Sequence, residues 1–136
     1  MIIVLDTNVV ISGILKPYGK AAAILHLAAE GTIRLAYDLR ILSEYRDVLK
    51  RPKFNFAKED VEAFLGQIEQ EGILISGKPL RLHLPDLDDE PFLEIASAAN
   101  AKAIVTGNKR HFPKKEYKGT KILSPAKFLD VLKGKT

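Results

Sequence analysis

The 136-residue sequence contains no cysteine and no tryptophan, and it has a single methionine. Without cysteine the chain cannot form disulfides, use a thiolate nucleophile or hold zinc through sulfur. No apolar run approaches the roughly 18 residues of a membrane-spanning helix. The apolar N-terminal segment also lacks the basic start and the small-residue cleavage site of a secretion signal. We therefore expect a cytoplasmic protein that does not associate with membranes.

Internal repeats, linkers and low-complexity segments are also missing from the sequence. Hydrophobic residues make up 46% of the chain, which is enough for a packed core and too much for a disordered protein. The length suits one domain with a sizeable core and is too short for two. We expect residues 1–136 to form a single domain.

Charge is unevenly distributed along the chain. The segment 59–94 has ten acidic and two basic residues, whereas the segment 102–121 has seven basic residues and one acidic residue. A basic segment beside an acidic pocket would attract a polyanionic substrate towards a metal-binding site. Ordinary solvated surface charge is the alternative interpretation, and charge alone does not separate the two.

Short apolar stretches alternate with amphipathic stretches along the sequence. Strands are predicted at 1–5, 33–37, 73–75, 103–106 and 121–123. Besides a helix that follows the first strand directly, helices are predicted at 21–30, 39–51, 58–71, 88–99 and 125–132. Residues 77–85 have no regular pattern. This alternation predicts a three-layer α/β/α fold, in which helices cover both faces of a central parallel sheet.

Asp6 ends the first apolar run abruptly. Thr7 and Asn8 can cap the helix that follows, which places Asp6 where the carboxyl end of a buried strand meets a helix N-terminus. In open α/β sheets, ligands bind at this edge. A capping role for Asp6 itself is the simpler alternative.

Three further residues carry oxygen ligands at comparable positions. Glu44 lies at the border of the apolar stripe of the helix predicted at 39–51, and Asp89 lies on the inward face of the helix predicted at 88–99. Asn108 follows the strand predicted at 103–106.

Each of these residues also has a structural explanation. Glu44 can be an exposed acid near Arg40 or Arg51. Asp89 can be a first-turn residue favoured by the helix dipole, with Asp86 and Asp88 competing for the ligand role. Asn108 can be a turn residue.

Carboxylates gathered at strand ends and helix starts are suited to a hard divalent cation. Mg²⁺ and Mn²⁺ prefer oxygen ligands. Such an ion can polarise a phosphate, lower the pKa of a bound water and stabilise a leaving oxygen. The candidate ligands and catalytic residues are Asp6, Glu44, Asp89 and Asn108.

Five segments of the chain, in this order and spacing, resemble the PIN-domain nucleases. The resemblance is to the toxin-type PIN proteins of prokaryotic toxin–antitoxin pairs, called VapC-like. It includes Asp6-Thr7-Asn8 in the first segment and Thr106-Gly107-Asn108 in the fourth. The matching segments are 3–13, 42–52, 85–96, 104–109 and 123–129.

This resemblance implies a three-layer endoribonuclease that uses Mg²⁺ or Mn²⁺ to cleave RNA phosphodiester bonds. Carried over by position, Asp6, Glu44 and Asp89 are the metal ligands. Such proteins often have an aspartate where this chain has Asn108, so the chain loses one negative charge there. We therefore expect one firmly held metal ion, and the occupancy of a second stays open.

The resemblance also implies partners. It indicates a cognate antitoxin protein and a homodimer, with RNA as the substrate. The basic residues that follow Asn108 are the expected phosphate contacts. These residues are Lys109, Arg110, Lys114 and Lys115.

Two other functions fit parts of the same pattern. A catalytically weak RNA-binding or interaction module on the same fold would account for Asn108. A phosphatase of the haloacid-dehalogenase type also presents an aspartate at a strand end. That family requires a second aspartate two residues later, and this chain has Asn8 there.

Overall fold

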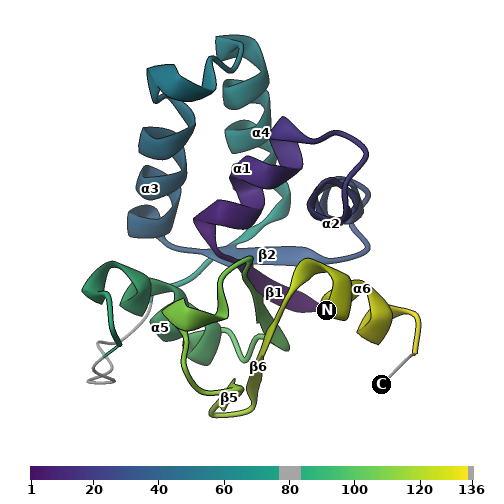
Figure 1. Cartoon of the computed structure of the whole chain (residues 1–136), viewed down its shortest axis with the longest axis vertical. Helices are drawn as coiled ribbons and strands as arrows, with labels where there is room; N and C mark the ends of the chain where they lie inside the picture. Colours follow the sequence, from purple (N-terminus) through teal and green to yellow (C-terminus); the bar gives the residue numbers. More distant parts are fainter. Residues whose placement is uncertain (77–83, 135–136) are drawn as a thin grey trace.

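The computed structural model describes residues 1–76 and 84–134 (Figure 1). Most of the irregular segment predicted at 77–85 therefore lies outside the described residues. Within the described residues, six strands form one sheet in the order β3-β2-β1-β4-β6-β5. The strands are β1 (Ile2–Leu5), β2 (Arg34–Tyr37), β3 (Ile73–Leu74), β4 (Ala103–Val105), β5 (Glu116–Tyr117) and β6 (Thr120–Leu123).

The sheet is parallel except at one edge. β1 lies between β2 and β4, β3 extends the sheet beyond β2, and β6 pairs with β4, all in parallel. β5 pairs with β6 in the antiparallel direction. β5 was not predicted, because it has only two residues. A tight turn joins it to β6, because Lys118 and Gly119 both have positive φ, at 49° and 87°.

Six helices of at least two turns accompany the described strands, and their bounds lie within one or two residues of the predictions. The helix predicted at 39–51 ends two residues early, at Leu49. Pro52 then begins a separate 3₁₀ turn, η1 (Pro52–Phe54). The helices are α1 (Thr7–Leu15), α2 (Lys20–Ala29), α3 (Leu39–Leu49), α4 (Lys58–Glu71), α5 (Glu90–Ala98) and α6 (Pro125–Leu132).

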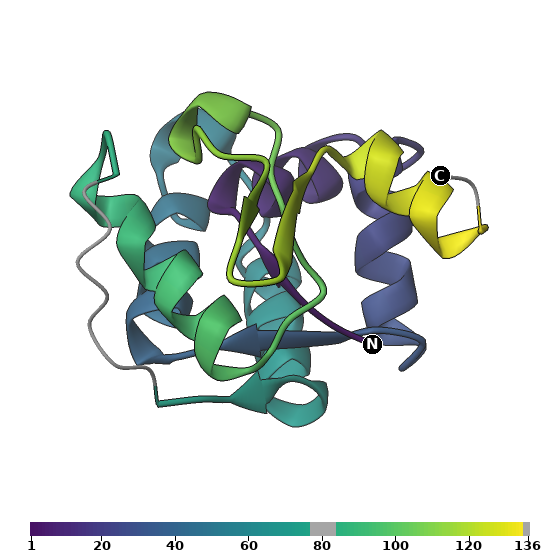
Figure 2. The same ribbon diagram turned by 90° about the horizontal axis from the view of Figure 1, so that it is seen from below.

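The helices lie on both faces of the sheet. α5 packs against β1, β2 and β4 on one face, and Figure 2 shows it in front of the strands. α1, α2 and α4 lie on the opposite face, above the sheet in Figure 1, and α6 packs against α2 at the β6 end. The predicted three-layer α/β/α arrangement is confirmed, with a sheet that is mostly parallel.

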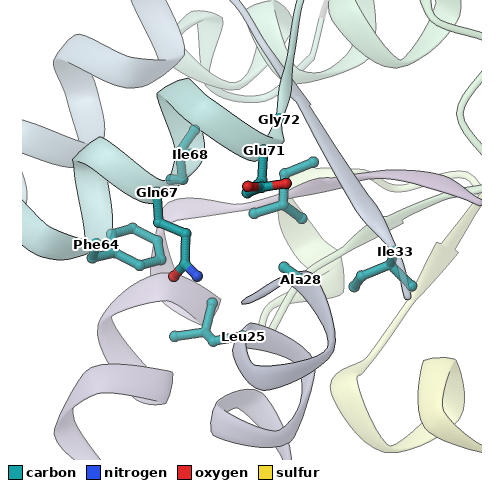
Figure 3. Close-up of a pocket in the computed structure, with 9 residues that line it drawn as sticks. Leu25, Ala28, Ile33, Phe64, Gln67, Ile68, Glu71 and Gly72 are labelled. Atoms are coloured by element: carbon teal, nitrogen blue, oxygen red, sulfur yellow. The ribbon is translucent and has the colours of Figure 1, made fainter. Parts of the chain in front are cut away.

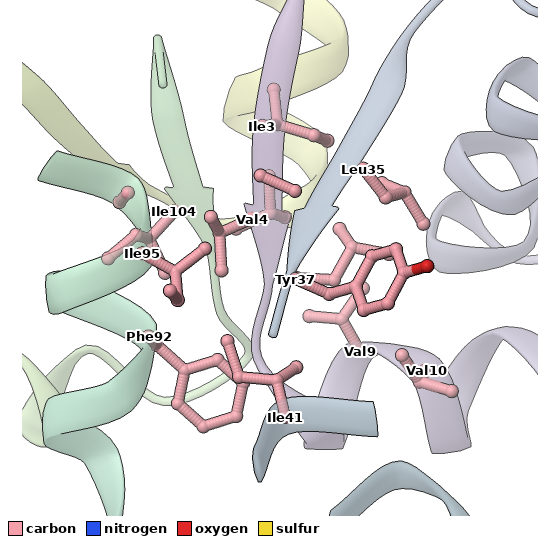
Figure 4. Close-up of a cluster of buried hydrophobic side chains, with 14 of the residues drawn as sticks. Ile3, Val4, Val9, Val10, Leu35, Tyr37, Ile41, Phe92, Ile95 and Ile104 are labelled. Atoms are coloured by element: carbon pink, nitrogen blue, oxygen red, sulfur yellow. The ribbon is translucent and has the colours of Figure 1, made fainter. Parts of the chain in front are cut away.

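β1 is the centre of the hydrophobic core. Ile3, Val4 and Leu5 are fully buried, and α5 packs directly against this strand. Figure 4 shows Val4 beside its register partner Ile104 of β4, with Ile95 of α5 next to them. An unbroken apolar run is what a strand buried on both faces requires.

The strand order places two loops side by side at the carboxyl edge of the sheet. The chain leaves β1 towards β2 on one side, whereas β4 pairs with β1 on the other side. Leu5 of β1 is the register partner of Val105 of β4, so Asp6 and Thr106 leave the sheet as neighbours. This is the topological switch point at which open α/β sheets bind their ligands.

A small cavity lies between α2, β2 and α4, away from this edge of the sheet (Figure 3). Its walls are mainly apolar and include Leu25, Ile33 and Phe64. With a volume of about 20 Å³ it has room for little more than a water molecule, so it is a packing gap and not a substrate site.

In the part of the chain that the structure describes, no helix combines the length and apolar character needed to cross a bilayer.

Candidate metal centre

Asp6 occupies the N-cap position of α1, but its side chain forms no capping hydrogen bond. The carboxylate is buried, and its Oδ2 instead accepts hydrogen bonds from Thr106 Oγ1 at 2.7 Å and from Asn8 Nδ2 at 3.1 Å. The capping role that was the simpler alternative is therefore not the one observed. Asp6 is held in a fixed orientation at the carboxyl end of β1.

Thr7 and Asn8 were expected to cap α1, and that expectation was wrong, because α1 begins at Thr7. Their side chains connect neighbouring elements instead. The Thr7 hydroxyl donates a hydrogen bond to Glu44 on α3. The Asn8 Oδ1 accepts one from the Gly107 backbone at 2.9 Å, which ties α1 to the loop after β4.

Asp89 lies directly before α5, at the end of a 3₁₀ turn, η2 (Leu87–Asp89). It is only 7% exposed, and its Oδ2 has no hydrogen-bond partner among the described residues. The two competing acids are exposed, and Asp86 accepts a hydrogen bond from the Asp88 backbone, which caps η2. Of these three acids, Asp89 is therefore the one directed towards Asp6.

Sequence reasoning missed His111, which the structure places between the two aspartates. Its Nδ1 donates a hydrogen bond to Asp6 Oδ2 at 2.9 Å and lies 3.9 Å from Asp89 Oδ2. One ligand atom from each of Asp6, Asp89 and His111 lies within 4.8 Å of the other two. The available signal was a histidine three residues after Asn108, at the carboxyl end of a central strand.

Glu44 joins the edge of this cluster through Thr7. It is half-buried on α3 and accepts the Thr7 hydrogen bond, while Thr7 directly follows Asp6. The partners considered for Glu44 are engaged elsewhere, because Arg40 pairs with Asp38 and Glu94 and Arg51 pairs with Asp47.

Asn108 shapes the loop after β4. Its Oδ1 accepts a hydrogen bond from the Arg110 backbone at 3.0 Å and caps a short 3₁₀ turn, η3 (Lys109–His111). Its Nδ2 lies 3.4 Å from His111 Nε2, and the side chain is exposed. Asn108 therefore directs the chain so that the His111 ring points back to Asp6.

The crowding of acids changes their protonation. Burial and the negative charge of Asp6 raise the pKa of Asp89 to about 7. Burial also raises the pKa of Glu44, against the opposing effect of the Thr7 hydrogen bond. Burial alone would lower the pKa of His111, but the hydrogen bond and charge of Asp6 outweigh it and raise the pKa. A nearby cation would favour the ionised forms of both acids.

These residues fit a divalent metal ion. Asp89 presents a buried carboxylate oxygen without a described hydrogen-bond donor, directed at the carboxylate of Asp6. Burying such a group without a partner costs free energy, which a bound cation would offset. Carboxylate oxygens are the ligands that Mg²⁺ and Mn²⁺ prefer.

The surface next to this cluster is open and basic. A hollow of about 360 Å³ is bordered by Asn8, Ser12 and His111. The four basic residues expected to contact phosphate are all exposed, and none forms an ion pair with a described residue. Lys109 and Arg110 belong to η3 itself, whereas Lys114 and Lys115 follow it towards β5.

The fold and the site together define an α/β protein with an acidic centre at the switch point of its sheet. The PIN domain family model matches residues 2–110, which is most of the chain. The chain therefore belongs to the PIN-domain family of nucleases.

One solved structure shows the same fold over nearly the whole chain. The crystal structure of VapBC2 from Rickettsia felis, bound to a DNA fragment from their promoter, contains a similar chain with a TM-score of 0.63. The two sequences are 24% identical, and the likeness covers 91% of this chain and 98% of that chain. No curated protein sequence matches this chain significantly.

Proposed function

We propose that this protein is a metal-dependent endoribonuclease that hydrolyses RNA phosphodiester bonds, and that it is the toxin of a toxin–antitoxin pair. One observation carries the proposal. The buried carboxylates of Asp6 and Asp89 converge at the switch point of the sheet, and one Asp89 oxygen has no described hydrogen-bond partner. Membership of the PIN-domain family agrees with this chemistry.

In this proposal, Asp6, Asp89 and Glu44 hold the ion, which is Mg²⁺ or Mn²⁺. When bound, such an ion activates water for attack and neutralises charge on the phosphate. Thr106 and Asn8 hold the Asp6 carboxylate in place through their hydrogen bonds. A ligand set fixed before the ion arrives loses less conformational freedom on binding.

Basic residues beside the centre account for the substrate. Lys109 and Arg110 lie on the turn that carries His111, so they can contact phosphates that flank the bond to be cut. Lys114 and Lys115 extend the same basic segment. Their positive charge offsets the repulsion between an RNA backbone and the acids of the centre.

The proposed partners follow from the structural relative. The similar chain comes from a VapBC2 complex bound to promoter DNA. We extend this to a cognate antitoxin protein, and the proposal includes a homodimer in the cytoplasm. A small DNA-binding protein encoded by the neighbouring gene, able to bind this chain and stop cleavage, is the expected antitoxin.

The test compares two site variants with the unaltered protein. Asp6→Asn and Asp89→Asn each remove one negative ligand while keeping the size of the side chain. Both are expected to lower RNA cleavage by roughly 100-fold or more, because the ion is then held by one carboxylate fewer. Cleavage is measured on a labelled RNA with added Mn²⁺, and Mn²⁺ affinity is measured by calorimetry.

Glu30→Gln is the matched control, because Glu30 is an exposed acid at the end of α2. It should cleave RNA and bind Mn²⁺ like the unaltered protein. If both site variants keep full cleavage and full Mn²⁺ affinity, the site assignment is wrong.

Asn108 favours a second candidate, a catalytically weak RNA-binding module on the same fold. Its oxygen already accepts the Arg110 hydrogen bond, and it supplies no negative charge to the cluster. RNA binding that persists with a chelator, without cleavage when Mn²⁺ is supplied, would favour this second candidate.

A further inference from the structure

We propose that His111 is a direct metal ligand through Nδ1, so that the site uses an imidazole besides carboxylates and prefers a transition-metal ion such as Mn²⁺ over Mg²⁺. This inference rests on the proposed function, because it concerns the same ion. It adds a ligand that the acidic pattern did not contain, and it narrows the class of ion that the site takes.

The first support is the geometry of the three donors. His111 Nδ1, an Asp6 oxygen and an Asp89 oxygen all lie within 4.8 Å of one another. His111 Nδ1 already donates a hydrogen bond to Asp6 Oδ2, with 2.9 Å between the two atoms. A cation that replaces this hydrogen is in reach of both atoms.

The second support is the unpartnered oxygen of Asp89. It lies 3.9 Å from His111 Nδ1, which is too long for a hydrogen bond. It nevertheless belongs to the same cluster of ligand atoms, in a residue that is only 7% exposed. An ion between the aspartates and the imidazole gives this oxygen the partner that it lacks among the described residues.

The third support is the way the chain fixes the imidazole. The Asn108 side chain caps η3, and the His111 backbone donates to the Asn108 carbonyl at 3.1 Å. The next residue, Phe112, is 1% exposed and anchors the turn in the core, with its ring edge-on to the imidazole. The ring is therefore placed by η3 on one side and by the core on the other.

Ligand chemistry connects this geometry to the choice of ion. Mg²⁺ strongly prefers oxygen ligands and keeps much of its water, whereas Mn²⁺ and later transition metals also accept imidazole nitrogen. A purely positioning role for His111 is the competing explanation. In that case its N–H only orients Asp6, and the ion contacts oxygen alone.

The two explanations differ in whether a nitrogen touches the ion. Pulsed electron paramagnetic resonance detects coupling between bound Mn²⁺ and a directly bonded nitrogen. We expect this coupling in the unaltered protein and its loss in His111→Gln. Calorimetry should show that His111→Gln binds Mn²⁺ roughly 10- to 100-fold more weakly, with a smaller change for Mg²⁺.

Two further variants keep the test decisive. His26→Gln removes an exposed histidine on α2 and should leave the nitrogen coupling and the Mn²⁺ affinity unchanged. His111→Asp replaces the nitrogen donor by an oxygen donor, so it should bind metal but lower the ratio of Mn²⁺ affinity to Mg²⁺ affinity. An unchanged ratio in His111→Asp contradicts the proposal.

Failure of the inference is distinct from failure of the proposed function. Mn²⁺ bound with no nitrogen coupling, or with coupling that persists in His111→Gln, overturns the role of His111 and leaves the carboxylate site standing. If the unaltered protein binds no Mn²⁺, both the role of His111 and the proposed metal-dependent function are overturned.

Discussion

Asp89 shows how a residue can serve a site at the expense of stability. Its carboxylate is buried beside Asp6, and the pKa of Asp89 is raised from 3.8 to about 7. Ionising this group in the metal-free protein costs free energy, because the charge loses water and faces another carboxylate. A residue with this cost is easier to explain by ligand binding than by folding.

We therefore predict that Asp89→Asn stabilises the metal-free protein. At about pH 8 its free energy of unfolding should exceed that of the unaltered protein by about 1–3 kcal/mol, because no charge is then buried. Urea unfolding with a chelator measures this difference. A variant that is less stable than the unaltered protein under these conditions would refute the electrostatic explanation.

The same shift gives the metal-free protein a pH-dependent stability. The pKa of Asp89 is higher in the folded chain than in the unfolded chain, so folding takes up a proton between about pH 4 and pH 7. Stability should fall as the pH rises through this range. The raised pKa of His111 acts in the same direction, because its stabilising charge is lost as the pH rises. Asp89→Asn should show a smaller decline.

At the scale of single elements, two glycines, one within α4 and one directly after it, have opposite constraints. Gly66 lies within the helix, and a Cβ atom there would meet nothing within 4 Å. Gly72 ends the helix, and a Cβ atom there would lie 2.6 Å from the Ile68 carbonyl oxygen and 2.8 Å from the Leu35 carbonyl oxygen. Only Gly72 is required by close approach of the backbone.

This contrast predicts opposite effects of the same substitution. Gly66→Ala should raise the free energy of unfolding by about 0.5–1 kcal/mol, because alanine loses less backbone entropy in a helix. Gly72→Ala should lower it by about 1–3 kcal/mol, because backbone atoms of α4 and β2 must move apart. Thermal unfolding of the two variants side by side checks the prediction. Equal effects of the two substitutions would contradict the close approach of Gly72 to the backbones of α4 and β2.

Local sequence patterns were sufficient for most elements and insufficient for two features. The predicted bounds of α4 and α6 match the structure, because apolar periodicity and a proline or glycine mark their ends. β5 was missed because two residues are too few to show a pattern. The start of α1 was placed too late, because Thr7 and Asn8 look like capping residues but use their side chains to reach Glu44 and Gly107.

Across the whole molecule, the candidate site combines residues from four separate segments. The sequence identified Asp6 because it ends an apolar run with a charge, and Asp89 because it is an acid on the inward face of the predicted helix. It did not identify His111, whose position depends on the turn of η3 and on the pairing of β4 with β1. Contacts of this kind depend on tertiary structure, so the spacing of His111 from Asn108 is not sufficient to predict them.

The placement of basic residues predicts a localised effect of salt on RNA binding. Replacing Lys109 and Arg110 by alanine should weaken RNA binding measured with a chelator, and should leave Mn²⁺ affinity nearly unchanged. When the logarithm of RNA affinity is plotted against the logarithm of salt concentration, the slope should become shallower in the variant. The expected change is roughly 0.7 for each phosphate contact to single-stranded RNA that the variant has lost. Fluorescence anisotropy over a range of salt concentrations measures the slope.

The control variant replaces Lys53 and Lys58 by alanine at the tip of the hairpin formed by α3 and α4 (Figure 1). It removes the same net charge at a different place. Equal loss of binding in both double variants would show that overall charge, and not the segment beside the site, attracts the RNA.

The central claim is that Asp6 and Asp89 form a divalent-metal site at the switch point of the sheet. The most direct measurement is the anomalous difference density of a crystal soaked in Mn²⁺. We predict a peak in contact with oxygens of both aspartates. The absence of a peak at this position, or a Mn²⁺ ion whose ligands include neither aspartate, would contradict the claim.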